Sequence, residues 1–258
     1  MTAAWVYYQK ELKELARSYK LLWIPVVFLI LGIMQPLAYT YLPEILQASG
    51  DVPPGLMDAY IVPGASEVMA QTIGQYGTVG MLVLALAAMN SISGERISGR
   101  AELIQVRPVS AGQIAAAKWL AHLTLLVLSL GAGVAGAWYY TGVLIGFVPW
   151  SGVLASAGYY CLWLLCVVSF TLLCSSFLRG AAAAGVALLT AAALSVLYQF
   201  LPSWASWTPA ALTGLSAQAL SGADGAALLG PCLSAAVWII GCVTGSAFFI
   251  ERSKLPRE

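Results

Sequence analysis

Charged side chains are scarce in this chain of 258 residues. They make up 9% of it, and 60% of the residues are hydrophobic, whereas a soluble domain carries roughly 25% charged residues. This composition excludes a disordered chain, a fibrous repeat and an ordinary soluble globule. Because each bilayer crossing needs about 20 apolar residues, several crossings fit, but a separate soluble catalytic domain of about 100 residues does not.

The motifs of the common catalytic and ligand sites are also missing. The sequence contains no Gly-x-x-x-x-Gly-Lys-[Ser/Thr] phosphate loop, no GxSxG and no HExxH. Its five cysteines form no CxxC pair and no Cys/His cluster. The single histidine, His122, is interpreted as a hydrogen-bonded packing residue. We therefore predict no catalytic residue, no metal ligands, no cofactor-binding residues and no nucleic-acid partner.

Long uncharged stretches predict an all-α membrane protein with six membrane-spanning helices. The stretch 119–178 is long enough for two spans and divides at the turn-rich segment 142–152. The polar second half of 180–223 leaves room for one span there. The six predicted spans cover residues 21–42, 71–93, 119–141, 153–177, 180–201 and 228–250.

With six spans, all twelve lysines and arginines fall on one side of the membrane. Basic residues favour the cytoplasmic side, so both termini are predicted to be cytoplasmic in a multi-pass protein of the plasma membrane. The segments 43–70 and 202–227 are then extracytoplasmic, and their charged residues are all acidic. The whole chain, 1–258, is interpreted as a single transmembrane domain. No charged residue lies in the middle of a predicted span, which argues against an ion-coupled secondary transporter.

Residues 4–20 are predicted to form an amphipathic helix along the inner membrane surface, with its bases near the lipid headgroups. Its apolar face follows helical spacing. That face consists of Trp5, Tyr8, Leu12, Leu15 and Tyr19. Two interpretations remain open, a passive anchor or an elbow helix that also packs against a cytoplasmic partner.

The cytoplasmic loop 94–118 is predicted to be a short helix, a kink and a second helix that runs into the third span. Pro108 ends the first helix. Ser110 caps the second, with Gln113 at the capping-box position. Lys118 is expected to extend to the headgroups. A solvated loop that only sets the topology is the alternative interpretation.

This loop resembles that of the permease subunits of ABC-2 type transporters. The resemblance is carried by Glu95-Arg96, Gly99-Arg100, Glu102-Leu103-Ile104, Pro108-Val109-Ser110 and Ala117-Lys118. The chain departs from the family pattern at two positions, where Arg100 replaces the usual Thr and Ala117 the usual Gly. The topology, the cytoplasmic termini and the amphipathic first helix are also similar to those of the family.

The resemblance implies an ABC-2 fold of the type V exporter kind, in which the loop is a coupling helix seated in a separate ATP-binding subunit. Two such subunits would bind the ATP and drive two copies of the permease, identical or paralogous. Glu95 would pair with Arg100 or with a basic residue of the first helix. The residues expected to contact or support the ATPase are Glu95, Arg96, Arg100, Glu102, Leu103, Arg107, Pro108, Val109 and Arg179.

The expected function is therefore that of a non-catalytic permease subunit of an ABC exporter. Because the pathway through the spans is interpreted as apolar, with Ser, Thr, Tyr and Gln as its polar groups, the expected cargo is amphipathic or hydrophobic, such as a drug, an antimicrobial peptide or a lipid-like molecule. The alternative is a non-transporting membrane anchor, assembly factor or immunity factor. A neighbouring gene for an ATP-binding cassette protein favours the first function over the second.

Overall fold

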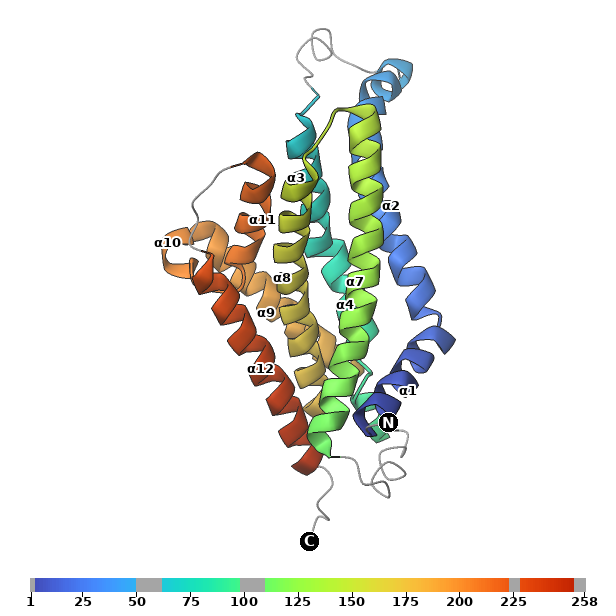
Figure 1. The fold of residues 1–258 in the computed structure, drawn as a ribbon, viewed down its shortest axis with the longest axis vertical. Helices are drawn as coiled ribbons and strands as arrows, with labels where there is room; N and C mark the ends of the chain where they lie inside the picture. Colours follow the sequence, from blue (N-terminus) through green and yellow to red (C-terminus); the bar gives the residue numbers. More distant parts are fainter. Residues whose placement is uncertain (1–2, 50–61, 98–109, 223–227, 253–258) are drawn as a thin grey trace.

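The computed structural model describes residues 3–49, 62–97, 110–222 and 228–252. These residues form a bundle of helices, without strands in the described ranges (Figure 1). In chain order the elements are α1 (Ala3–Arg17), α2 (Lys20–Ser49), α3 (Ala65–Gln75), the π-helix η1 (Tyr76–Gly80), α4 (Met81–Ala88), α5 (Ser93–Ile97), α7 (Ala111–Leu144), α8 (Trp150–Phe177), α9 (Gly180–Phe200), α10 (Pro202–Ala205), α11 (Ala211–Ser221) and α12 (Leu229–Arg252).

Six stretches of the described chain are long and apolar enough to cross a membrane, which confirms the predicted number. They are Lys20–Ile45, Ala65–Ile97, Ala111–Leu144, Trp150–Phe177, Gly180–Phe200 and Leu229–Arg252. The helices extend beyond the predicted spans. The segment 43–70, predicted as a connection, is helical as far as Ser49 and again from Ala65. The helix predicted to feed the third span is continuous with that span in α7.

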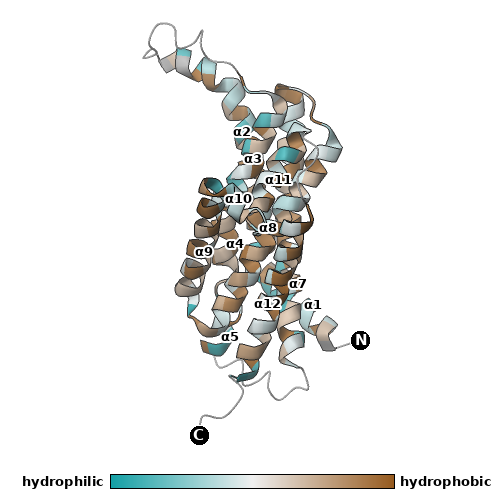
Figure 2. Ribbon diagram, turned by 90° about the vertical axis from the view of Figure 1, so that its left-hand side faces the viewer, coloured by the Kyte–Doolittle hydropathy of each residue, from teal (hydrophilic) through white to brown (hydrophobic). Residues whose placement is uncertain are grey.

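The fourth span, α8, is the centre of the bundle. Most of its side chains are buried, and it packs against α4, α7, α9, α11 and α12 (Figure 1). The helices α9 and α12 flank it and leave most of their side chains exposed or partly exposed. In Figure 2, hydrophobic residues predominate along α9 and through the middle of the bundle. A lipid-facing surface is expected to have this composition.

The first and third spans approach each other at two glycines. A Cβ atom added to Gly32 of α2 would lie 2.2 Å from the carbonyl oxygen of Gly133 in α7. Small residues allow such close backbone approach between membrane helices. The phenol of Tyr76 lies at the same crossing, donates a hydrogen bond to the Phe28 carbonyl at 3.1 Å and stacks on the Phe28 ring at 4.9 Å.

The second span is interrupted by the π-helical turn η1, after which it continues as α4. Its Gly77 leaves room for Tyr160 of α8, whose hydroxyl would lie 2.1 Å from an added Cβ atom. That hydroxyl donates to the Gly74 carbonyl at 3.1 Å. Extra residues in a helical turn often mark functional positions, and here the turn aligns the second span against the first and the fourth.

One end of the bundle carries α1, α5, the first turns of α7 and the last turn of α12 (Figure 1). There Ile250 of α12 packs with Tyr7 of α1 and Ile114 of α7. We call this the basic end. The described lysines and arginines lie here or in the turn between α8 and α9. They are Lys10, Lys13, Arg17, Lys20, Arg96, Lys118, Arg179 and Arg252. The first and last helices therefore lie at the same end of the bundle. That this end faces the cytoplasm stays a prediction.

Candidate functional site

The helix α1, Ala3–Arg17, covers most of the predicted helix 4–20, and part of the predicted apolar face packs against the bundle. Leu15 is buried, and Tyr8 and Leu12 pack partly buried against the core. Trp5 and Tyr19, however, are 49% and 71% exposed.

Tyr19 lies beyond the helix, with a left-handed backbone φ of 57°. The face turned toward α7 also contains Tyr7 and Glu11, which are 9% and 5% exposed. An apolar face that lies along the membrane is exposed on the protein itself, so the predicted membrane contact of Trp5 and Tyr19 stays a prediction.

Glu11 is buried because it meets a lysine of the third span. The ammonium of Lys118 lies 3.0 Å from Glu11 Oε1 and 3.0 Å from Glu95 Oε2. All three side chains are nearly enclosed, with 2%, 6% and 11% of the Lys118, Glu11 and Glu95 side chains exposed. One ammonium thus joins α1, α5 and α7.

A second lysine completes the network from the solvent side. Lys10 Nζ lies 2.8 Å from Glu11 Oε1, 2.5 Å from Glu95 Oε1 and 3.3 Å from Glu14 Oε2. Two lysines therefore balance the two buried carboxylates, and Glu14 stands at the exposed edge. Buried charges are tolerated when they are paired and hydrogen-bonded in this way. We call Lys10, Glu11, Glu95 and Lys118 the ion-pair network.

The pKa values of the α1 groups reflect this environment. Burial by itself would lower the pKa of Lys10, but the carboxylates of Glu11 and Glu95 outweigh it and raise this pKa above its ordinary value. Burial, followed by the charge of Glu95, raises the pKa of Tyr7. Lys10 therefore stays charged and Tyr7 stays neutral throughout the physiological range.

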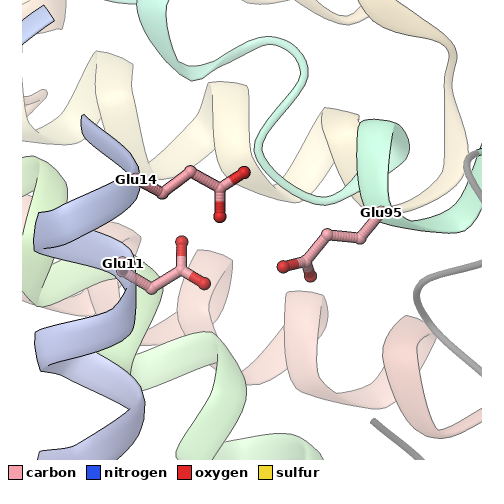
Figure 3. A group of neighbouring side chains, drawn as sticks. All are labelled: Glu11, Glu14 and Glu95. Carbon is pink, nitrogen blue, oxygen red and sulfur yellow. The ribbon is translucent and has the colours of Figure 1, made fainter. Parts of the chain in front are cut away.

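The carboxylates of Glu11, Glu14 and Glu95 point toward one another from α1 and α5 (Figure 3). One oxygen of each lies within 4.8 Å of the others, which is close enough to share a cation. The cationic positions are filled by the ammonium groups of Lys10 and Lys118. We therefore interpret the cluster as an ion-pair network and not as a metal site.

The short helix α5 is also attached to the end of α8. Arg96 Nη1 donates to the Ser176 carbonyl at 2.7 Å, and Nη2 donates to the Leu178 carbonyl at 3.4 Å. A basic side chain at the last carbonyls of a helix stabilises that terminus. Arg96 was predicted to contact the partner, and in the described structure it binds the end of α8. Arg179, which comes directly after Leu178 in the chain, is exposed.

Ser175 makes the second attachment between these helices. Its Oγ accepts hydrogen bonds from the backbone amides of Ile92 and Ser93 at 3.3 and 3.1 Å. It donates its own proton to the Met89 carbonyl at 2.7 Å. The turn that leads from the second span into α5 is therefore held to α8 by a buried side chain.

Replacing Ser175 with alanine is expected to leave two buried amides without an acceptor and to cost about 1–3 kcal/mol of stability. Hydrogen exchange should accelerate at Ile92 and Ser93, because those amides lose their protection. The matched substitution of the exposed Ser221 should leave both rates unchanged. Unaltered exchange in the Ser175 variant would show that this bond does not protect the turn.

The predicted cap of the helix entering the third span is confirmed. Ser110 Oγ accepts from the Gln113 amide at 3.3 Å, and the Gln113 side chain accepts from the Ser110 amide at 3.3 Å. The remaining loop predictions fall on the segment 98–109, outside the described residues. They concern Arg100, Glu102, Leu103, Arg107, Pro108 and Val109. The described structure thus holds both ends of this segment, through α5 and α7.

Comparison with known proteins bears directly on this arrangement. The family described as ABC-2 family transporter protein matches residues 5–210 of the chain. The chain belongs to the ABC-2 transporter family. The uncharacterized transmembrane protein YxlG of Bacillus subtilis (strain 168) is 37% identical over 205 residues, which cover 78% of this chain and 79% of the relative.

ABC-2 permeases are membrane subunits and are generally non-catalytic, so this chain is the membrane subunit of an ABC transporter. Membership of the family also implies an ABC ATPase as partner. The matched residues include the whole ion-pair network and the residues Arg96 and Ser175, which attach α5 to α8. The site therefore lies within the part of the chain that defines an ABC-2 protein.

Three predictions about single residues of the ABC-2 chain have clear outcomes. Glu95 does pair with a base of the first helix, Lys10. Lys118 does not extend to the headgroups, since it is 2% exposed and binds two carboxylates. His122 is a buried packing residue as predicted, with Nδ1 2.9 Å from the Lys118 carbonyl.

Sequence reasoning missed Glu11 altogether. One signal was present, because Tyr7, Glu11 and Leu15 follow one another at four-residue spacing on a single face of the helix. A carboxylate in such a row indicates a buried partner. The partner, however, stands 107 positions further along the chain, and no local pattern connects the two residues.

Proposed function

We propose that this chain is the permease subunit of an ABC exporter in the plasma membrane, with its basic end and both termini in the cytoplasm. Two copies, identical or paralogous, form the translocation pathway, and two copies of a separate ATPase drive it. The sequence contains no phosphate-binding Gly-Lys loop, so ATP is bound by the partner. The cargo is amphipathic or hydrophobic.

The ion-pair network is the observation that supports this proposal most directly. It ties α1, the end of the second span and the start of the third span together by direct contacts of 3.0 Å or less. The segment 98–109 lies between two of these elements. A force applied there by an ATPase would move α1, α5 and α7 as one body, which is the form of motion that rigid-body switching requires.

Charge reversal in this segment should uncouple the transporter. We expect Glu102→Lys and Arg107→Glu, each co-expressed with the cognate ATPase, to lower permease-stimulated ATP hydrolysis about tenfold, because each would place a like charge against its partner. The control is Glu44→Lys at the opposite end of the bundle. Stimulation at the wild-type level in both loop variants would remove these residues from the ATPase contact.

Affinity purification of the tagged chain from its native host in mild detergent is the broader test. Copurification of an ABC ATPase with hydrolytic activity is the expected result. Purification with an unrelated enzyme, and without ATPase activity, would favour a membrane anchor, assembly factor or immunity factor instead. This outcome would contradict the exporter proposal.

A further inference from the structure

Five polar side chains face one another between α2 and α3 in the half of the bundle away from the basic end. Tyr39 donates to the side-chain oxygen of Gln71, and Gln75 donates to the side-chain oxygen of Gln35. Gln71 Nε2 also lies 3.5 Å from Glu67 Oε1. We call Gln35, Tyr39, Glu67, Gln71 and Gln75 the polar seam.

The inner part of this seam lies at the depth of the hydrocarbon. Lys20, at the basic end, donates a hydrogen bond to the Ala87 carbonyl at 2.8 Å, so these two residues lie within the reach of one lysine side chain. At 1.5 Å per helical residue, Gln35 lies about 22 Å along the helix from Lys20, and Gln75 about 18 Å from Ala87. Both distances fall within a hydrocarbon core about 30 Å thick.

The described residues cover the seam only in part. Gln35, Tyr39, Gln71 and Gln75 are only partly buried, and Glu67 is exposed. An amide that faces lipid without a partner is costly, so polar groups at this depth face protein or a water-filled path. The Oε1 atom of Gln75 is itself enclosed and accepts no hydrogen bond from any described residue.

Apolar side chains border the seam, and its open end is acidic. Met34 directly precedes Gln35 and Val79 follows Gln75 by four residues. Their side chains are 54% and 42% exposed, so the helices that carry the seam also expose apolar side chains. Glu67 and Glu44 are exposed toward the end opposite the basic one. The lysines and arginines that the structure describes all lie outside this half, so the field of its acidic residues attracts cations.

We propose that the polar seam is the contact surface for the transported molecule, and that this molecule is an amphipathic cation. The inference rests on the proposed exporter function and adds the substrate class and the site. The apolar body lies against Met34 and Val79, and its polar groups exchange hydrogen bonds with Gln35 and Gln75. The ring of Tyr39 and the carboxylate of Glu67 favour the positive charge.

Tetraphenylphosphonium provides the test, because tetraphenylborate has nearly the same size and shape with the opposite charge. Binding of both labelled ions is measured on the complex of permease and ATPase in nanodiscs. We expect saturable binding of the cation only. The double variant Gln35→Leu/Gln75→Leu should bind it about tenfold more weakly, and Glu67→Gln about threefold more weakly.

Gln199→Leu is the matched control, since Gln199 is exposed on α9 away from the seam. This variant should bind tetraphenylphosphonium with the affinity of the wild type. Melting temperature and light scattering verify that each variant is folded and assembled. Equal binding of both ions, or wild-type affinity in the double variant, would overturn the proposal. Loss of the permease oligomer in that variant would assign the seam to the contact between copies and would overturn it also.

The two proposals fail in different ways. If no ABC ATPase copurifies with the wild-type chain, the exporter function is wrong whatever binds the seam. If the complex forms and hydrolyses ATP but does not prefer the cation, the exporter function stands and the seam's role as a cation-contacting surface is wrong.

Discussion

Replacing Lys118 with methionine should lower the free energy of unfolding by about 3–5 kcal/mol. The substitution keeps most of the side-chain volume but leaves the carboxylates of Glu11 and Glu95 buried without their central cation. Because each kcal/mol shifts the melting temperature of a chain of this size by about 2–4 °C, the midpoint in detergent should fall by about 10 °C. Fluorescence-detected melting measures this shift.

Lys13→Met is the matched control, since Lys13 is exposed on α1 outside the network, and it should change stability by less than about 0.5 kcal/mol. The double variant Lys118→Met/Glu11→Gln should lose less than the sum of the two single variants, because the second substitution removes one of the stranded charges. Strict additivity would mean that Lys118 and Glu11 do not interact.

Replacing Gly133 with alanine should cost about 2–3 kcal/mol by overpacking the crossing of α2 and α7. Its new Cβ atom would lie 2.3 Å from the Tyr76 hydroxyl and 2.7 Å from the Phe28 carbonyl oxygen. The second of these atoms belongs to the backbone, so a side-chain rotation does not relieve the clash. The two spans must move apart, and the same melting experiment detects the loss.

The neighbouring Gly131 lies in the same helix and provides the control. A Cβ atom added there meets nothing within 4 Å, so Gly131→Ala should be neutral or slightly stabilising through helix propensity. Adding Tyr76→Phe to Gly133→Ala removes the shortest of these contacts, the one with the hydroxyl, and should restore part of the stability. If the two alanine variants melt at the same temperature, α2 and α7 do not cross at Gly133.

The six spans were predictable because insertion into a bilayer depends on segments of about 20 residues taken one at a time. The cap at Ser110 was predictable for the same reason, since its partner Gln113 lies three positions away. Segment ends were predicted less well. Helices continue beyond the apolar core wherever they pack against other helices, as α7 does from Ala111 onward.

The candidate site was predicted only in part. Glu95 and the first helix were expected to meet, but the ammonium that joins them to the third span was assigned to the lipid surface. Arg96 was expected to face a partner, and in the described chain it binds carbonyls of α8. In each case the sequence identified a charged residue near the membrane edge without indicating which element would lie beside it.

The sequence by itself determined the class of the protein, the number of its spans and the side on which its bases gather, because hydrophobicity and charge act along the chain. Only the tertiary structure decided the rotation of α1, the burial of Glu11 with Lys118, the crossing at Gly32 and the alignment of the polar seam. These features depend on atoms from helices far apart in the chain. Their energies arise only when the helices are packed, since a buried charge or a close backbone contact has no counterpart in an isolated span.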